Sequence, residues 1–145
     1  MEMKNWKDLF ELIGIAAIVV SLFFVGLELR QNTDAVKAST IYGMSSLYQE
    51  FYLLMASDPE LTRIFRDGRQ DMGQLSENEF ARFLWIERSR VVRLQTAFLQ
   101  WQRGTLGDQD WMFYRSFVCR ESERQSWDST KTILVPDFVA YAESC

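Results

Sequence analysis

The chain has 145 residues, no histidine, and 16 Lys and Arg against 20 Asp and Glu, which gives a formal net charge of −4. This acidic balance argues against a nucleic-acid partner, because phosphate binding needs a cationic face. The absence of histidine removes the commonest metal ligand and general base, and we expect no enzyme, no catalytic residue, no cofactor and no metal. Hydrophobic residues make up 48% of the chain and aromatic residues 14%, enough for the core of a single domain.

The first predicted element is an apolar run from Leu9 to Leu29, with the sequence LFELIGIAAIVVSLFFVGLEL. Its polar residues are Glu11 and Glu28, near the two ends, and Ser21. About 21 residues at roughly 1.5 Å each reach about 31 Å, which spans the hydrocarbon core of a bilayer. The sequence therefore predicts a flank over 1–8, a transmembrane helix over 9–29 and an α-helical soluble domain over 30–145.

A buried core helix and a cleavable signal peptide are the alternatives to a membrane span. A core helix would need a polar stripe where it meets water, yet 12–27 is apolar or small on every face. A signal peptide needs a basic start, which Glu2 and Asp8 interrupt. The span fits the pattern best, and Ala17 and Ser21 give it a small-xxx-small spacing that suits helix pairing.

A polar collar, Arg30–Thr33, follows the run, and apolar residues then recur at spacings of three and four. These residues are Ile41, Met44, Tyr48, Phe51 and Met55. The spacing places them on one helical stripe that ends near Ser57. Two alternatives stay open: the membrane helix continues into the domain as one rod of about 50 residues, or it breaks at the collar.

A second helix is predicted to begin at Asp58 and Pro59, with the aspartate as N-cap and the proline at the first helical position. We expect it to end at about Asp67, before Gly68. Its apolar face consists of Leu61, Ile64 and Phe65.

The strongest helix pattern begins at the capping box Ser76–Glu79 and runs to about Gln102 or Arg103, where Gly104 ends it. Its predicted inward stripe consists of Phe80, Leu84, Glu87, Val91, Leu94, Phe98 and Trp101. A carboxylate on an apolar stripe must be paired or protonated. Glu87 therefore has three interpretations: a structural ion pair, a helix rotated so that Glu87 faces water, or a functional acid. The candidate ion-pair partners are Arg82, Arg90 and Arg115.

Three further helical segments are expected after Gly104. The first is capped by Asp108 and runs to about Arg124, and shorter ones begin at Ser126–Trp127 and at Pro136. The inward residues of the first are Trp111, Tyr114, Phe117 and Val118. Since no strand pair stands out, the predicted fold class is all-α, an N-terminal transmembrane helix that continues into a small helical bundle.

The two cysteines, Cys119 and Cys145, form neither a metal-binding CxxC motif nor a disulfide framework, so a reducing compartment and a packing role for Cys119 are expected. Arginines alternate with acids along the presumed helices, a pattern typical of a solvated, ion-paired surface. The two runs are Arg88, Arg90 and Arg93 after Glu87, and Arg120 and Arg124 around Glu121 and Glu123.

Aromatic residues are numerous enough to line a pocket for a lipid tail or an apolar ligand, although packing is their simpler role. They are Trp85, Phe98, Trp101, Trp111, Phe113, Tyr114 and Phe117. A pocket also needs convergent polar groups, which the sequence does not show.

Four segments together resemble a widespread group of uncharacterised small bacterial membrane proteins. They are Glu11 to Thr33, of the type ELIGxxAxVxSLxxxxxxxRQNT, then Asp58 to Leu61, Ala97 to Leu106, and Pro136 to Phe138. The resemblance covers most of the chain and implies a single-pass, helical, bacterial protein. It carries over no functional residues.

Basic residues flank the apolar run almost equally, with Lys4 and Lys7 before it and Arg30 and Lys37 after it. The proteins that the chain resembles keep the basic flank after the span, and the unpaired cysteines agree, so we expect the inner membrane with a cytoplasmic domain. The expected function is an interaction module or accessory subunit, whose partners are the bilayer and another protein or a second copy. The alternative is a membrane-tethered sensor or binder of a lipid or apolar small molecule.

Overall fold

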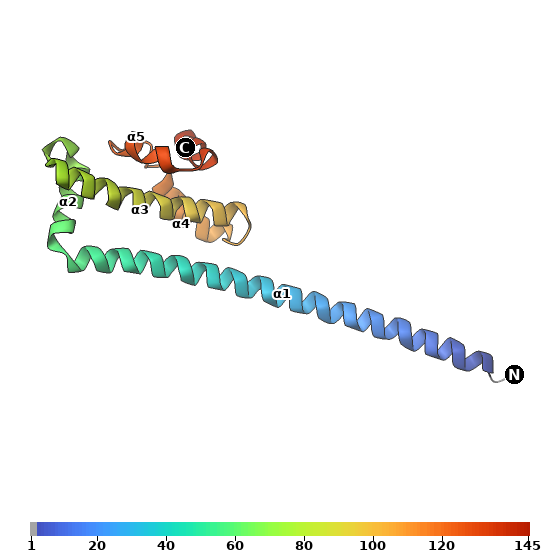
Figure 1. Ribbon diagram of the computed structural model, residues 1–145. Helices are drawn as coiled ribbons and strands as arrows, with labels where there is room; N and C mark the ends of the chain where they lie inside the picture. Colours follow the sequence, from blue (N-terminus) through green and yellow to red (C-terminus); the bar gives the residue numbers. More distant parts are fainter. Residues whose placement is uncertain (1–2) are drawn as a thin grey trace. The chain divides into compact units, whose positions relative to one another are not determined.

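The computed structural model describes residues 3–145, so Met1 and Glu2 of the expected flank 1–8 lie outside the described residues. All regular elements from residue 3 onward are helical, which confirms the all-α fold class (Figure 1). The helices are α1 (Met3–Ser57), α2 (Pro59–Gln70), α3 (Glu77–Gln102), α4 (Asp108–Val118), α5 (Trp127–Thr130) and α6 (Pro136–Ser144), with 3₁₀ turns η1 (Met72–Gln74) and η2 (Lys131–Ile133).

The chain divides into two compact units, Met1–Ala38 and Ser39–Cys145. Helix α1 contributes to both, and it is helical through the collar Arg30–Thr33, so a break at the collar is wrong. The Thr33 hydroxyl donates to the Leu29 carbonyl at 2.9 Å, a bond that keeps this polar side chain on the helix surface.

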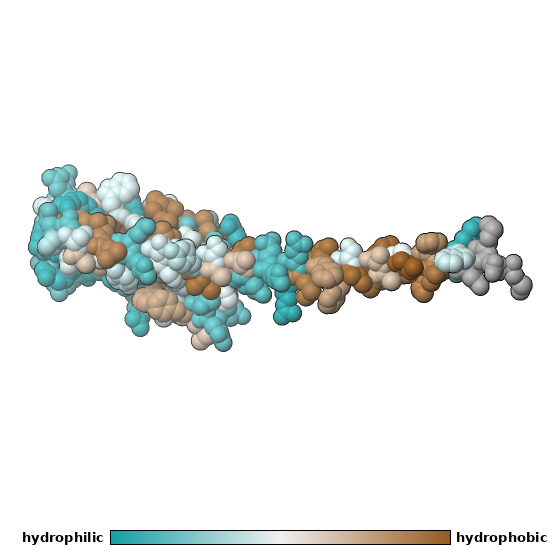
Figure 2. All heavy atoms as spheres, turned by 90° about the horizontal axis from the view of Figure 1, so that it is seen from below, coloured by the Kyte–Doolittle hydropathy of each residue, from teal (hydrophilic) through white to brown (hydrophobic). Residues whose placement is uncertain are grey.

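The first unit exposes the apolar run of α1. Phe10 and Leu22 are 67% and 66% exposed, and Figure 2 shows brown, hydrophobic side chains along the visible face of this stretch. One described helix is long and apolar enough to cross a membrane, and it is this one. None of its apolar 18-residue window is buried.

Helix α3 forms the centre of the second unit, where it contacts α2, α4 and α5. The Phe98 ring lies 5.9 Å from Trp111 of α4 and 5.6 Å from Phe138 of α6, and Trp101 stacks on Trp111 at 4.9 Å. Burying each large apolar side chain contributes about 1.5–3 kcal/mol. This aromatic cluster therefore holds the last helices against the C-terminal half of α3.

The stripe predicted on α3 is right from Glu87 to Phe98 and differs from the buried face at both ends of the helix. The buried residues are Phe83, Ile86, Glu87, Val91, Leu94, Ala97 and Phe98. The predicted Phe80, Leu84 and Trp101 are only half-buried. In the first half of the helix, Phe83 is the residue that packs closely on α2, at Gly68.

Helix α2 begins as predicted, since the Asp58 carboxylate accepts from the backbone N–H groups of Glu60 and Leu61, both at 3.0 Å. Its predicted end at Asp67 is wrong, because the helix continues through Gly68 to Gln70. A Cβ on Gly68 would lie 2.5 Å from the Phe83 ring. The glycine therefore permits close packing of two helices rather than ending one.

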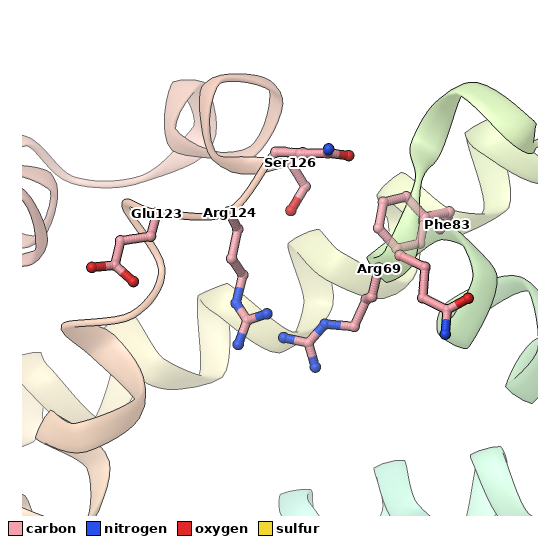
Figure 3. A pocket seen from close by; sticks show the side chains of 8 residues that line it. Arg69, Phe83, Glu123, Arg124 and Ser126 are labelled. Carbon is pink, nitrogen blue, oxygen red and sulfur yellow. The ribbon is translucent and has the colours of Figure 1, made fainter.

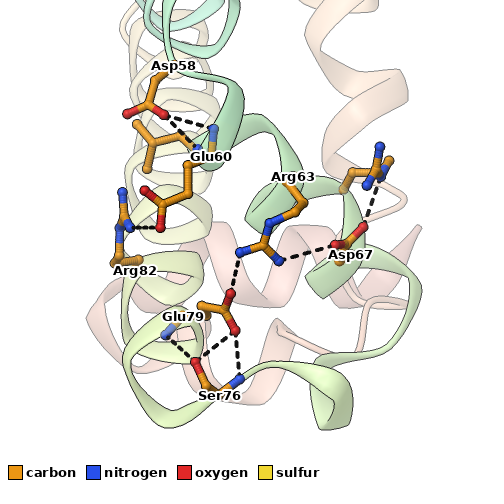
Figure 4. A network of polar contacts seen from close by, with 9 residues as sticks. Asp58, Glu60, Arg63, Asp67, Ser76, Glu79 and Arg82 are labelled. Atoms are coloured by element: carbon orange, nitrogen blue, oxygen red, sulfur yellow. Dashed lines mark hydrogen bonds and ion pairs between the residues drawn. The ribbon is translucent and has the colours of Figure 1, made fainter.

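Helix α2 is also joined to the start of α3 by a polar network (Figure 4). Arg63 pairs with Glu79, and Arg82 reaches back to Glu60 at 2.7 Å. The predicted capping box at Ser76 is confirmed, because its side chain accepts from the Glu79 backbone while Glu79 accepts from Ser76 N–H at 2.9 Å. The hydrogen bonds from Arg63 and then Ser76 lower the pKa of Glu79 to about 2.

Helix α4 is shorter than predicted. Gly107 occupies the N-cap, and Asp108 is instead the first helical residue, whose carboxylate accepts from the Trp101 indole N–H at 2.8 Å. The helix ends at Val118 and not near Arg124. Turns follow and lead to α5.

Cys119, immediately after α4, forms a disulfide with Cys145 at the end of α6, so the expectation of unpaired cysteines is wrong. Their Cα atoms lie 5.2 Å apart, within the ordinary range for a disulfide. The indole N–H of Trp127 donates to Glu143 at 2.9 Å and holds α6 beside α5. This return of the chain brings together two cysteines that are 26 positions apart.

Candidate functional site

A cavity of about 220 Å³ opens within the second unit between the end of α1, α2, α3 and the segment that follows α4. Five arginines line it, Arg69, Arg90, Arg93, Arg120 and Arg124, which we call the arginine cluster. The remaining lining residues are Tyr48, Phe51, Tyr52, Phe65, Leu94 and Phe117. The cavity, here named the arginine cavity, thus combines aromatic walls with guanidinium groups.

Two buried glutamates hold part of the cluster in place. Glu87 is fully buried and accepts from Arg90 at 2.7 Å, with Arg69 3.5 Å away. Glu121, also buried, accepts from Arg90 Nη1 at 2.8 Å and from Arg124 Nε at 3.1 Å. Arg90 therefore bridges two carboxylates, an arrangement in which each charge is paired and hydrogen-bonded.

Of the three interpretations of Glu87, the ion pair is confirmed and the water-facing one is wrong. The predicted partner Arg90 is correct, while Arg82 pairs with Glu60 instead. Arg69 of α2 is a partner that the sequence did not indicate.

The arginine cluster holds more positive charge than its acids neutralise. Five guanidinium groups line the cavity, and the two carboxylates pair with three of them, Arg69, Arg90 and Arg124, so three positive charges are left over. Among the residues whose side chains are described, no acid lies within ion-pair distance of Arg93 or Arg120. A partly buried surplus of this kind attracts an anion.

Arg93 shows the surplus most clearly. Its Nε and Nη2 atoms are buried and have no hydrogen-bond partner. Its guanidinium lies 4.2 Å from the centre of the Phe51 ring and 5.9 Å from that of Tyr48, which are cation–π distances. Ring faces offer such a group no lone pair in the plane of its N–H bonds, so two strong donors stay unused.

The pKa shifts follow from burial and from these neighbours. Burial lowers the pKa of Arg93, and burial together with the charge of Arg90 lowers that of Arg69. Burial acts the same way on Arg90, but the hydrogen bond to Glu121 and the charge of Glu87 outweigh it and raise the pKa. Burial, then Tyr114, raises the pKa of Tyr48 to about 12, so its hydroxyl stays a donor at neutral pH.

A second cavity of about 210 Å³ shares Arg69 and Arg124 with the first, and these two residues therefore lie between the cavities. Figure 3 shows their side chains extending toward one another from α2 and from the segment after α4. We call this second one the polar cavity. Its other lining residues are Gly68, Gln70, Phe83, Glu123, Gln125 and Ser126.

A groove of about 640 Å³ runs between α1 and α3 on the surface of the second unit. Trp85 is 68% exposed in it and Ile133 49% exposed. Its lining residues are Leu47, Glu50, Phe51, Leu54, Trp85, Arg88, Ser89, Val92, Arg93, Thr96 and Ile133. We call it the apolar groove, because large hydrophobic side chains dominate its exposed surface.

The simpler role given to the aromatic set, packing, is confirmed for four of its seven members, and Trp85 lines the apolar groove. Phe117 alone of that set lines the arginine cavity, whereas Trp85 and Phe113 are exposed and the other four belong to or pack against the core. The interpretation of the arginines as a solvated surface is wrong for Arg90, which is largely buried. Arg90 and Arg93 are three positions apart, and a spacing of three or four indicates that two side chains lie on the same face of a helix. This spacing is the signal from which the clustering of these two arginines could be predicted.

From residue 6 onward, no group of three or more acids and cysteines is placed to hold a metal ion. Comparison with known proteins identifies no relative: no family model, no curated protein and no solved structure matches the chain.

Proposed function

We propose that the chain is a single-pass inner-membrane protein, anchored by residues 9–29. The length, apolar character and complete exposure of this part of α1 support the proposal, because such a surface is stable only in lipid or under a cover. Alkaline carbonate extraction tests it: the protein stays in the membrane pellet, and release into the supernatant would contradict the anchor. The intact mass of the extracted chain distinguishes an anchor from a cleaved signal sequence.

The domain faces the oxidising side of that membrane. The Cys119–Cys145 disulfide supports this placement and opposes the cytoplasmic one, because reducing compartments keep thiols unpaired. Protease treatment of cells with a permeabilised outer membrane tests the orientation. Digestion of the domain agrees with the proposal, and protection until the inner membrane is lysed contradicts it.

The domain acts as a binding protein and not as an enzyme, and it takes a small anionic ligand with an aromatic or apolar body. One observation carries this function: Arg93, which lines the arginine cavity, has two buried N–H groups without a partner, beside guanidinium groups that carry surplus positive charge. Leaving such donors unsatisfied costs about 1–3 kcal/mol, which an anion accepting from them removes.

The walls of the arginine cavity define the rest of the ligand. Phe51 and Phe65 present ring surface to it, and Phe117 closes it from α4. Guanidinium groups bind planar or tetrahedral oxyanions through paired N–H donors, while ring surfaces accept an apolar body. The convergent polar groups that a pocket needs are thus present.

Benzenesulfonate, which joins an anion to an aromatic ring, is a suitable probe, with uncharged benzyl alcohol as its neutral counterpart. Saturation-transfer NMR of the full chain in non-ionic detergent should detect benzenesulfonate and not benzyl alcohol. Arg93→Gln should weaken binding at least fivefold. Arg82→Gln is the matched control, because Arg82 pairs with Glu60 outside the cavity and its loss should leave binding unchanged.

Should both probes bind equally, or should Arg93→Gln and Arg82→Gln behave alike, the arginine cavity would not be an anion site.

The apolar groove favours a second function, self-association with another copy of this chain. The groove carries both Glu50 and Arg88, and the Arg88 Nε is buried without a partner. We propose a two-fold contact in which each copy's Glu50 pairs with the other copy's Arg88 and in which Trp85 and Ile133 become buried. Sedimentation in detergent tests it: Trp85→Glu should give monomers, whereas Met112→Glu, exposed elsewhere, should not. Dimers that persist in Trp85→Glu would contradict it.

A further inference from the structure

The polar and arginine cavities meet at Arg69 and Arg124, and this junction indicates the chemistry of the ligand's charged group. Both guanidinium groups carry the same charge, and the charge of Arg124 contributes to lowering the pKa of Arg69. Each forms an ion pair with a buried glutamate, Arg69 with Glu87 and Arg124 with Glu121. An anion between Arg69 and Arg124 would accept hydrogen bonds from both guanidinium groups.

The charge balance at this junction favours a dianion. Three positive charges remain after Glu87 and Glu121 are counted, and Glu123 of the polar cavity leaves two. A carboxylate or sulfonate compensates one charge, whereas the dianion of a phosphate monoester compensates both. Each additional pair of opposite charges contributes more binding free energy in a partly buried site than in water, because the local dielectric constant is lower.

The hydrogen-bonding groups of the cavity lining also favour a phosphate monoester. Residues that line the arginine cavity offer donors: Arg93 Nε and Nη2 are buried without a partner, and the Tyr48 hydroxyl keeps its proton at neutral pH because its pKa is raised. A phosphate monoester offers three strong acceptor oxygens and no obligatory donor in its dianionic form. A cavity of about 220 Å³ with ring walls leaves room beside the phosphate for a small apolar substituent.

We propose that the ligand is a phosphate monoester with a small aromatic or apolar substituent, whose phosphate lies in the arginine cavity, where Arg69, Arg93 and Arg124 all line the wall, and whose substituent packs on the aromatic side chains of that cavity. The inference rests on the proposed binding function and makes it more specific. Gln70, Gln125 and Ser126 line the polar side of the junction and can donate to the phosphate from there.

Charged and titratable groups approach the junction from every neighbouring element. They are Tyr48 and Tyr52 of α1, Arg69 of α2, Glu87, Arg90 and Arg93 of α3, and Arg120, Glu121, Glu123 and Arg124 after α4. The chain has no histidine, the side chain that ordinarily titrates between pH 5 and 8. A change in affinity across that range therefore reports the second ionisation of the phosphate, near pH 6.

Calorimetric titration of the full chain in non-ionic detergent with phenyl phosphate and with benzenesulfonate tests the inference. The two probes share a ring and differ in charge at neutral pH. At pH 7.5 phenyl phosphate should bind at least tenfold more tightly, and the ratio should fall toward one at pH 5. Arg120→Gln should weaken phenyl phosphate severalfold without disturbing the fold, because Arg120 is exposed.

Equal affinity for both probes, independent of pH, would overturn the phosphate assignment and leave the anion-binding function standing. Failure of both probes to bind would overturn the function as well. Competition by vesicles that contain phosphatidate, a lipid monoester, would identify a lipid source of the phosphate, and loss of competition would identify a soluble one. Either source agrees with the inference.

Discussion

Replacing Cys145 with serine opens the disulfide to Cys119 without removing any other packing group, and it should destabilise the second unit strongly. The disulfide joins positions 26 apart. Closing a loop of that length lowers the conformational entropy of the unfolded chain, which stabilises the folded state by about 3.5 kcal/mol at 25 °C. For a domain of this size about 1 kcal/mol corresponds to roughly 4 °C, so the unfolding midpoint should fall by about 10–15 °C.

Tryptophan fluorescence of the full chain in detergent, followed during heating, measures this midpoint. Trp111 and Trp127 lie in the core and report on the second unit. Adding reductant to the wild type should reproduce the shift of Cys145→Ser. The double variant that also carries Cys119→Ser provides the control, because reductant should leave its midpoint unchanged.

Two results would contradict a stabilising disulfide between Cys119 and Cys145. A shift below about 2 °C would mean that the unfolded chain gains almost no freedom when the disulfide opens. Two free thiols in denatured protein purified without reductant would mean that Cys119 and Cys145 are not paired in the cell, and the placement on the oxidising side would lose its support.

Gly68→Ala should lower the free energy of unfolding by about 1–3 kcal/mol in a denaturation experiment, because its new methyl group meets the buried Phe83 ring. Gly43→Ala, in open space on α1, is the control and should stabilise slightly. Equal effects of the two variants would contradict the close packing at Gly68. Glu87→Gln should cost about 3–5 kcal/mol by leaving Arg90 without one of its carboxylates, and a neutral result would show that the network is not buried as described. Since Glu79 has its pKa lowered to about 2 in the folded state, its stabilising contribution is complete above its ordinary pKa near 4.5 and is lost as the pH falls toward 2. Glu79→Gln should therefore flatten the fall of the unfolding midpoint between pH 5 and 2, and an unchanged pH profile would argue against the pairing.

The starts of α2 and α3 could be predicted from the sequence because their signals are local. Asp58 and Ser76 cap the helices that follow them through hydrogen bonds within three residues. Helix ends were harder, since Gly68 serves contact with another helix and the end of α4 depends on where the chain must turn. The disulfide depends on the path of α5 and α6, which no local pattern near Cys119 encodes.

The candidate site was predictable only in its central ion pair. Periodicity placed Glu87 inside, and the physics of a buried carboxylate required an arginine, which Arg90 supplies. The cavity itself joins Arg69 to Arg124, which approach from different elements. Their convergence is a consequence of tertiary packing, and composition, with its net charge of −4, indicated the opposite sign of field.

A crystal structure of the full chain with 4-bromobenzenesulfonate would show whether the arginine cluster binds an anion. The bromine's anomalous signal locates the probe independently of any interpretation of weak density. We expect a peak inside the arginine cavity near Phe51 and Phe117, with the sulfonate on guanidinium groups of the arginine cluster. A peak confined to other surfaces, or no peak at a concentration that saturates binding in solution, would contradict it.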